Sequence, residues 1–420
     1  MERNSDMGQS KLSALRKKWS NLFHIIRWED IKDLFLILVS CPVGLTMRLF
    51  RKNIWIVSEM EHTARDNGYW FFKYVREMHP DWPVYYPIQF SSADYPKVAA
   101  IGNVIRHGSF KHHVYTWAAE VDISARTGRG LPARLMSHLF QKKGLYPFKT
   151  VFLQHGVINN VLDFLKKELN NIDYFFATTE PEAESICRDL HYDPEQVRIT
   201  GLSRFDQLND FTVDPKQILL MPTWRSWLYP LFGKVTEESM QAVRSSNYVQ
   251  TYSSFLADPR LNAFLEKNDL HLLFFPHSQM QPFLSSFTGE NSRIRIASME
   301  EYDVQTALKE SAYLITDYSS INFDFAYMKK PMCYFQFDYE EFRSRHYAEG
   351  YFSYERDGFG PVVKTVDALV DELIASYGSG FVMQEAYQHK VDDTFVFRDG
   401  KNSERVLAEI LKISKRKERR

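Results

Sequence analysis

Short apolar runs of four to six residues recur along the chain, and they alternate with longer stretches whose apolar residues fall at helical spacing. Each short run is typical of a strand buried on both faces, and each longer stretch is typical of a helix that covers such a sheet. The runs fall into two groups that meet near residue 212. The predicted strands are 54–58, 84–87, 151–154, 174–178 and 197–200, then 217–221, 272–275, 294–297, 313–316 and 332–337.

This alternation predicts an α/β protein with two Rossmann-like, doubly wound domains. We expect the first domain at residues 53–212 and the second at 213–400, between a helical segment at 1–52 and a C-terminal helix with a basic tail at 401–420. The composition agrees, because 44% hydrophobic residues in a chain of 420 are enough to fill two cores.

The N-terminal segment differs in charge from the rest of the chain. Residues 1–52 carry ten Lys and Arg against five Asp and Glu. The whole chain has a net charge of −1, and this near-neutral charge argues against a nucleic-acid partner. The uncharged apolar run 34–47 is shorter than the roughly 20 residues of a spanning helix, and Pro42 and Gly44 interrupt it. We therefore expect amphipathic helices that lie on an anionic membrane surface. The alternative is a helix packed on the protein's own core.

Three cysteines, Cys41, Cys187 and Cys333, are far apart and show no metal-ligand spacing. Neither a disulfide framework nor a zinc site is predicted, and the cysteine usage fits a reducing, cytosolic setting. No carboxylate cluster suggests a metal, and we expect no cofactor.

Polar side chains follow several predicted strands. One predicted strand ends at Gln154, His155 and Gly156. A second is followed by Thr223 and Arg225, and a third is followed by His277. Ligands of doubly wound sheets bind off the carboxyl ends of the strands, so these positions are candidates for binding and proton transfer. A lone histidine or arginine in such a place is more often structural.

The segment 315–331 predicts a buried strand, a polar turn and a helix that opens on Ser319 and Ser320. Unpaired N–H groups and hydroxyls at a helix start favour a phosphate group. The plainer interpretation is that Asp317 and the serines only cap the helix.

Taken together, these residues resemble the bacterial CDP-glycerol glycerophosphotransferase family, whose members build teichoic acids and capsule polymers. Seven motifs in order carry the resemblance, from about Trp55 to Val363: Ala64-Arg-Asp-Asn67, Gln154-His-Gly156, Gly201-Leu-Ser-Arg204-Phe-Asp206, Pro222-Thr-Trp-Arg225, Pro276-His277, Thr316-Asp-Tyr-Ser-Ser320 with Phe323-Asp-Phe325, and Lys330-Pro331 with Phe337-Asp-Tyr-Glu340.

The resemblance implies a GT-B-like architecture, with an acceptor-binding first domain and a nucleotide-binding second domain facing a cleft. It implies transfer of glycerol phosphate from CDP-glycerol to a membrane-linked glycan, teichoic acid or capsule acceptor, with release of CMP, by a peripheral enzyme on the cytoplasmic face of the cell membrane. His155 and His277 would be catalytic. The donor phosphates would meet Thr223, Arg225, His277, Asp317, Ser319, Ser320 and Asp324, and the acceptor cleft would include Arg65, Asp66, Asn67, Gln154, Gly156 and Arg204.

Three alternatives stay open at this point. CDP-ribitol could replace CDP-glycerol as the donor. A GT-B glycosyltransferase that uses a nucleotide sugar would share the cleft and the phosphate site but would transfer a sugar carbon. A non-catalytic membrane-bound partner of a polymer-assembly complex is the third.

Overall fold

The computed structural model describes residues 28–128, 130–133, 135–228, 235–289 and 291–414. These residues form two compact units: unit 1 runs to Phe152 and includes Asn170–Asp173 and the chain from Ile410, whereas unit 2 comprises Leu153–Leu169 and Tyr174–Glu409. The domain limits 53–212 and 213–400 stay a prediction. The basic residues predicted to meet a membrane in 1–27 and in the tail 415–420 lie outside the described residues.

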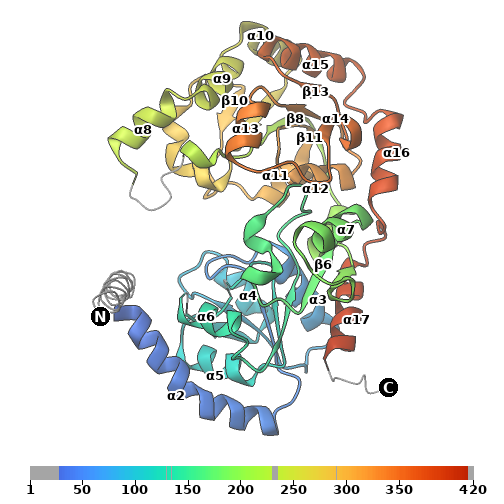
Figure 1. Cartoon of the computed structure of the whole chain (residues 1–420). Coiled ribbons are helices and arrows are strands. Elements are labelled where there is room, and N and C mark those ends of the chain that lie inside the picture. Colours follow the sequence, from blue (N-terminus) through green and yellow to red (C-terminus); the bar gives the residue numbers. More distant parts are fainter. Residues whose placement is uncertain (1–27, 129, 134, 229–234, 290, 415–420) are drawn as a thin grey trace, which may run out of the picture. The chain divides into compact units, whose positions relative to one another are not determined.

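Unit 1 alternates strands with helices, as Figure 1 shows in blue and cyan. Its elements are α2 (Trp28–Phe50), β1 (Trp55–Ser58), α3 (Asn67–Met78), β2 (Val84–Ile88), α4 (Tyr95–Ile101), β3 (Val104–Arg106), α5 (Phe110–Ala118), β4 (Val121–Ser124), α6 (Met136–Lys142) and β5 (Lys149–Phe152).

Unit 2 begins with a parallel strand pair and continues into a second sheet. Its strands are β6 (Tyr174–Ala177), β7 (Val197–Ile199), β8 (Asp214–Leu220), β9 (His271–Phe274), β10 (Ile294–Ile296), β11 (Ser311–Thr316), β12 (Met332–Phe335) and β13 (Val362–Val363). Its helices are α7 (Glu180–Asp189), α8 (Glu237–Arg244), α9 (Asn247–Leu256), α10 (Pro259–Lys267), α11 (Val304–Glu310), α12 (Ile321–Tyr327), α13 (Tyr339–Arg345), α14 (Tyr354–Asp357), α15 (Val366–Gly378) and α16 (Glu385–Thr394), and α17 (Asn402–Ile413) continues past its end.

Both units contain doubly wound parallel sheets. In unit 1 the strand order is β3-β2-β1-β4-β5, and in unit 2 it is β10-β9-β8-β11-β12-β13, with parallel pairing in each. The order reverses between β1 and β4 and again between β8 and β11, and such switch points are where ligands of these folds bind. The predicted α/β class with two Rossmann-like sheets is confirmed.

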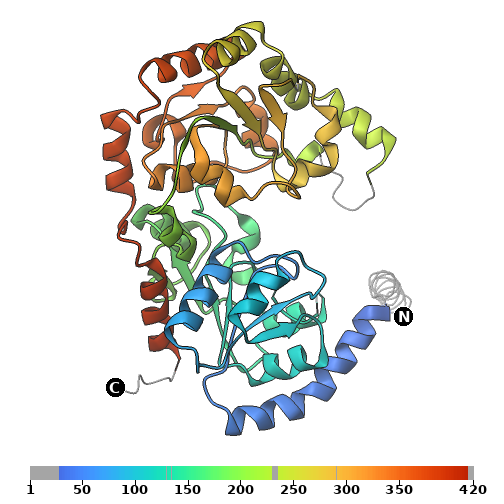
Figure 2. The ribbon, with the colours of Figure 1, turned by 180° about the vertical axis from the view of Figure 1, so that it is seen from behind.

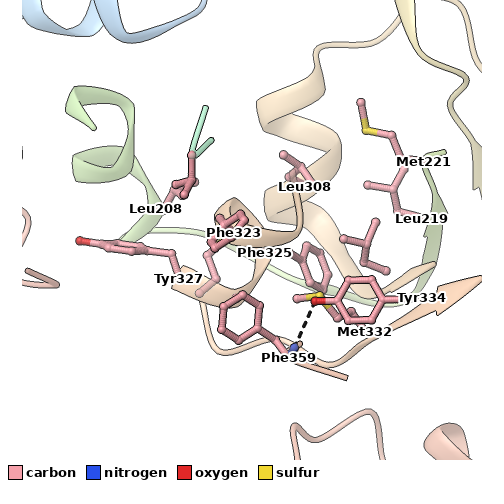
Figure 3. Packing of buried hydrophobic residues seen from close by; sticks show 14 of the residues in the cluster. Leu208, Leu219, Met221, Leu308, Phe323, Phe325, Tyr327, Met332, Tyr334 and Phe359 are labelled. Carbon is pink, nitrogen blue, oxygen red and sulfur yellow. Dashed lines mark hydrogen bonds between the residues drawn. The ribbon is translucent and has the colours of Figure 1, made fainter. Parts of the chain in front are cut away.

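The second sheet is covered on both faces, because alternate residues of each strand enter different cores. On β8, Leu219 belongs to the core drawn in Figure 3 together with Phe323 and Tyr334, whereas Leu220 belongs to the core beneath α9, α10 and α15. In Figure 3 a hydrogen bond from the Phe359 N–H to the Tyr334 hydroxyl, 3.1 Å long, closes the first core. This packing fixes the carboxyl ends of β8, β9 and β11.

The helix α2 is longer than the sequence pattern predicts. It has 23 residues and continues through Pro42, so by length and composition it could cross a membrane, a test that core helices and signal sequences also pass. The helix is longer than the apolar run 34–47 because flanking residues join it, and its placement on a membrane surface stays a prediction.

One side of α2 packs on α5, and the two helices lie along each other in Figures 1 and 2. A Cβ added to Gly44 would lie 2.4 Å from Trp117 Cβ, and the Trp117 indole donates to the Ile37 carbonyl at 3.0 Å. Elsewhere α2 exposes large apolar side chains, namely Trp28, Ile31, Phe35, Leu38, Val39, Val43, Leu45, Leu49 and Phe50. The helix therefore both packs on unit 1 and presents an apolar surface.

Candidate active site

The switch point of the second sheet brings together the residues that follow β8 and β11. Leu220 of β8 pairs with Ile315 of β11, so the segments after the two strands start side by side. The Thr223 N–H donates to Asp317 Oδ1 at 2.8 Å, and the Tyr318 N–H donates to the same oxygen at 2.5 Å. Asp317 is buried and joins the two turns, so it does not cap α12 as the plainer interpretation supposes.

Ser319 and Ser320 are half-buried at the start of α12, and Ser320 is its N-cap residue. The Ser320 side chain makes no capping hydrogen bond, and the Phe323 N–H bonds to the Ser320 carbonyl. The Ser320 hydroxyl faces Gly156, because a Cβ added to that glycine would lie 2.9 Å from Ser320 Oγ. The structure thus brings the predicted phosphate turn to the predicted His155 loop, and its phosphate-binding role stays a prediction.

Arg225 lies beneath this turn with its guanidinium fully buried. Its Nε and Nη2 donate to Asp338 at 2.7 and 3.0 Å, and its Nη1 donates to Asp317 at 2.9 Å and to the Thr223 carbonyl at 2.7 Å. Burial opposes the charge, but the two carboxylates outweigh burial and raise the pKa of Arg225 well above its usual value. Its donors are directed at protein groups, so the guanidinium that we expected to face phosphate supports the turn instead.

The loop after β5 carries His155, whose side chain is exposed. Arg204 donates from Nη1 to the His155 carbonyl and from Nε and Nη2 to the two oxygens of Asp324, at 2.7 and 2.8 Å. Gln305 Nε2 also donates to Asp324, at 3.3 Å. Since Asp324 belongs to α12, the buried Arg204–Asp324 pair ties the backbone of the histidine loop to the helix that Ser320 begins.

Glu182 is a second anchor of this loop, and the sequence analysis missed it. Its carboxylate accepts the N–H of Ile158 and the N–H of Thr178, both at 2.6 Å. Burial raises the pKa of Glu182 to about 7, although these backbone donors oppose the rise. Thr179 with Glu182 three residues later matches a helix capping box, a pattern that conceals the role in holding the loop.

A third anchor comes from the segment 339–354. Arg343 Nη1 donates to Asn160 Oδ1 at 2.6 Å, Asn160 Nδ2 donates to Asn159 Oδ1 at 2.9 Å, and Asn159 Nδ2 donates to the Tyr354 hydroxyl at 2.8 Å. Gln154 has a φ of 63° and donates to the Phe176 carbonyl, which fixes the sharp turn before His155. The loop is therefore held on three sides while the histidine side chain stays accessible.

His277 is half-buried and follows β9. Its Nδ1 accepts the Gln279 N–H at 3.2 Å, and its ring stacks with Trp224 at a centroid distance of 6.2 Å. Trp224 lies in the turn after β8, so His277 belongs to the same group of strand ends as Thr223 and Arg225. Its predicted contact with the donor phosphates stays a prediction.

Arg65, Asp66 and Asn67 lie in unit 1, at the start of α3. Arg65 pairs with Asp94 at 2.9 Å, and Asp66 accepts the Asn67 N–H at 2.8 Å as the N-cap of α3. Buried Glu59 accepts the N–H groups of Arg65 and Asp66, and burial together with the Asp66 charge raises the pKa of Glu59 to about 8. These contacts give the motif a structural part, and its place in an acceptor cleft stays a prediction.

Within the described ranges, no group of three or more His, Cys, Asp or Glu side chains is arranged to hold a metal ion. The Arg225 and Arg204 ion pairs lie near the switch point of the second sheet, and His155 and His277 lie on the loops beside them. The imidazoles and the serine hydroxyls at this site are groups that can bond to phosphate oxygens.

Comparisons with known proteins bear on what this site does. A family model described as CDP-Glycerol:Poly(glycerophosphate) glycerophosphotransferase matches residues 41–412. The chain is 29% identical to the minor teichoic acid biosynthesis protein GgaB of Bacillus subtilis (strain 168) over 87% of its length, and 22% identical to the teichoic acid poly(glycerol phosphate) polymerase of that organism over 96%. It spans 40% and 54% of the lengths of these relatives.

A solved structure of a variant of the wall teichoic acid polymerase TagF, soaked with CDPG, is similar in fold. The TM-score is 0.65 at 18% identity, over 96% of this chain and 98% of that chain. At this identity the likeness shows the fold, and the predicted GT-B-like class is confirmed.

Proposed function

The chain belongs to the CDP-Glycerol:Poly(glycerophosphate) glycerophosphotransferase family, and we propose that it transfers glycerol phosphate from CDP-glycerol to a hydroxyl of a membrane-linked teichoic acid, capsule or glycan acceptor, releasing CMP. One observation supports this function most: the exposed His155 sits on a loop that the Arg204–Asp324 pair ties to α12, where Ser319 and Ser320 open the helix. The same ion pair thus connects the proposed proton acceptor to the helix that begins at the proposed phosphate turn.

In the proposed reaction His155 takes the proton of the acceptor hydroxyl, whose oxygen attacks the phosphorus that carries glycerol. A bond forms between that oxygen and phosphorus, the bond from the phosphorus to the bridging oxygen breaks, and CMP leaves with the electron pair. The three anchors hold the backbone of the loop that carries the imidazole, and positioning of this kind contributes a large share of catalysis in phosphoryl transfer.

The donor phosphates would lie against Ser319, Ser320 and His277. The two serine hydroxyls are suited to anionic oxygens. His277 Nδ1 accepts the Gln279 N–H, so the proton of the neutral ring is on Nε2. Arg225 would not contact the phosphates itself. Its buried ion pairs would hold the turns that contain Thr223 and Asp317 in place.

The acceptor would be linked to a membrane lipid, and the enzyme would work as a peripheral protein on the cytoplasmic face of the membrane. The exposed apolar side chains of α2 support this placement, since a helix face of this kind inserts at the boundary between headgroups and acyl chains. Packing of α2 on α5 favours a helix that lies on the surface with unit 1 attached.

A donor screen that measures CMP release tests the function. Vesicles with a polyprenyl-linked teichoic acid primer would be incubated with the enzyme and CDP-glycerol, CDP-ribitol or a UDP-sugar in parallel. We expect acceptor-dependent CMP release with CDP-glycerol. Turnover of CDP-ribitol alone would assign the protein to ribitol phosphate transfer, and turnover of the UDP-sugar alone would contradict phosphotransfer.

A further inference from the structure

His346 follows α13 and lies against the turn after β8. Its Nδ1 accepts the Ser226 N–H at 3.1 Å, and the Ser226 hydroxyl donates to the Arg345 carbonyl at 3.0 Å. A ring nitrogen that accepts a hydrogen bond carries no proton, so the proton of the neutral imidazole is on Nε2. The backbone of the β8 turn therefore selects the tautomer of His346.

Surrounding groups keep this imidazole neutral. Burial, followed by the positive charge of Arg225 and the nearby His277, lowers the pKa of His346 to about 3. The ring stacks on Phe342 with centroids 4.8 Å apart and meets the Trp224 ring edge-on, also at 4.8 Å. At neutral pH His346 is thus a fixed, uncharged hydrogen-bond donor.

The Nε2–H group of His346 has no hydrogen-bond acceptor within the part of the chain that the structure describes. His346 Nε2 is buried and makes no hydrogen bond, and the hydroxyl of Thr223, three residues before Ser226, is buried without a partner as well. A buried N–H group without an acceptor is unfavourable, and native proteins keep few of them. Two unpaired polar atoms beside one turn point to a ligand that supplies the missing partners.

The location indicates which ligand that is. Trp224 meets the ring of His346 edge-on and stacks with the ring of His277, so both histidines lie beside one indole. His277 is the residue that the proposed function places at the donor phosphates. A phosphate oxygen accepts hydrogen bonds, which suits the Nε2–H group of a neutral imidazole.

We propose that His346 is a donor-binding residue whose Nε2–H donates a hydrogen bond to a phosphate oxygen of the CDP-linked substrate. This inference rests on the proposed function, because the ligand is the same nucleotide. It adds a binding residue: His277 and His346, which both contact Trp224, would bind the phosphates of the same substrate.

Two substitutions separate ligand binding from a structural role. In His346→Asn the side-chain oxygen can still accept the Ser226 N–H, but the donor at the Nε2 position is lost. In His346→Gln the longer side chain returns an N–H to that position and gives up the contact with Ser226. A purely structural histidine predicts that Asn is tolerated better than Gln, whereas a phosphate-binding histidine predicts the reverse.

Isothermal titration with CDP-glycerol measures the difference, with thermal melting of each variant as the check on folding. We expect His346→Asn to weaken binding about tenfold or more and His346→Gln to weaken it clearly less. His389→Asn, a change to an exposed histidine on α16, is the control and should bind like the wild type. Wild-type affinity in His346→Asn, or an equal loss in both variants, would overturn the inference.

A second measurement needs no variant. In a long-range ¹H–¹⁵N spectrum of the imidazole rings, His346 should show the Nε2–H tautomer, and its Nε2 signal should shift when CDP-glycerol is added. An unchanged His346 signal at saturating CDP-glycerol would contradict the inference while leaving the proposed function intact. Absence of any CDP-glycerol binding by the wild type would count against the proposed function itself.

Discussion

Arg204 and Asp324 form a two-pronged ion pair, with nitrogen–oxygen distances of 2.7 and 2.8 Å between residues 120 positions apart. Both side chains are buried, and Arg204 also donates to the carbonyl of His155. The pair therefore connects the histidine loop to α12. Movement of the histidine loop relative to α12 would break this ion pair, and because both side chains are buried, water would not readily replace the lost hydrogen bonds.

Asp324→Asn should destabilise the protein and slow turnover together. The substitution leaves the Arg204 guanidinium buried without its counter-charge, which costs about 3–5 kcal/mol. Urea unfolding and CMP release would measure the two effects. Asp367→Asn removes a carboxylate from the exposed Arg260 pair and should change little, because solvent screens such pairs. Equal stability of the two variants would argue against the coupling.

Arg225→Lys tests whether this residue supports the turn or binds phosphate. A single lysine nitrogen cannot reproduce the contacts that Nε, Nη1 and Nη2 make with Asp317, Asp338 and the Thr223 carbonyl. We expect the free energy of unfolding to fall by about 1.5–3 kcal/mol for each charged hydrogen bond that is lost. Thermal melting with and without CDP-glycerol would measure it. A variant that melts like the wild type yet binds CDP-glycerol poorly would return Arg225 to the donor site.

The sequence predicted that several candidate residues would lie near one another, because strand ends are visible in it. Apolar runs locate β8, β9 and β11, and their carboxyl ends must meet in a parallel sheet, so the grouping of His277, Thr223 and Ser319 follows from the pattern. The direction of the Arg225 side chain could not be predicted, since it depends on Asp338, a residue 113 positions further on.

Two other features were hidden by their local patterns. Glu182 looks like a capping residue of α7, and only the folded loop shows that it also holds the Ile158 N–H. The strands β3, β4 and β13 were missed, because β3 and β13 have three and two residues and β4 contains Asp122, whose charge interrupts the apolar run. Burial of a carboxyl inside a strand is a tertiary effect.

Asp122 should make the stability of the protein depend on pH. Burial raises its pKa from 3.8 to about 7, so between about pH 4 and pH 7 the unfolded chain releases a proton that the folded protein keeps. Stability contributed by the neutral carboxyl is present below pH 4 and is lost as the pH rises through 7. Asp122→Asn stays neutral, so its advantage over the wild type should grow by roughly 2–3 kcal/mol from pH 5 to pH 8.

Urea unfolding of both proteins at the two pH values measures this difference. Asp393→Asn, which changes an exposed carboxyl on α16, is the control and should show no such growth. A difference between Asp122→Asn and the wild type that stays constant with pH would mean that Asp122 is ionised in the folded protein.

The apolar surface of α2 should bind membranes. Phe35→Glu combined with Leu38→Glu should lower cosedimentation with anionic vesicles by about tenfold or more, because each buried side chain of this size contributes about 1.5–3 kcal/mol. The melting temperature should not change, since both side chains are exposed. Deletion of the whole helix is less informative, as it would uncover Trp117 on α5.

Leu139→Glu is the matched control, because Leu139 is an exposed leucine on α6 of the same unit. Equal vesicle binding of the control, the α2 variant and the wild type would show that α2 is not a membrane contact.

His155→Ala tests the proposed reaction most directly, with CMP release and CDP-glycerol affinity measured on the same preparation. The imidazole acts on the acceptor, so its removal should lower acceptor-dependent CMP release by about 10²-fold or more and leave CDP-glycerol affinity and melting temperature near those of the wild type. Turnover that falls only in proportion to a weaker affinity would place His155 at the donor. Full turnover would contradict its role as the base.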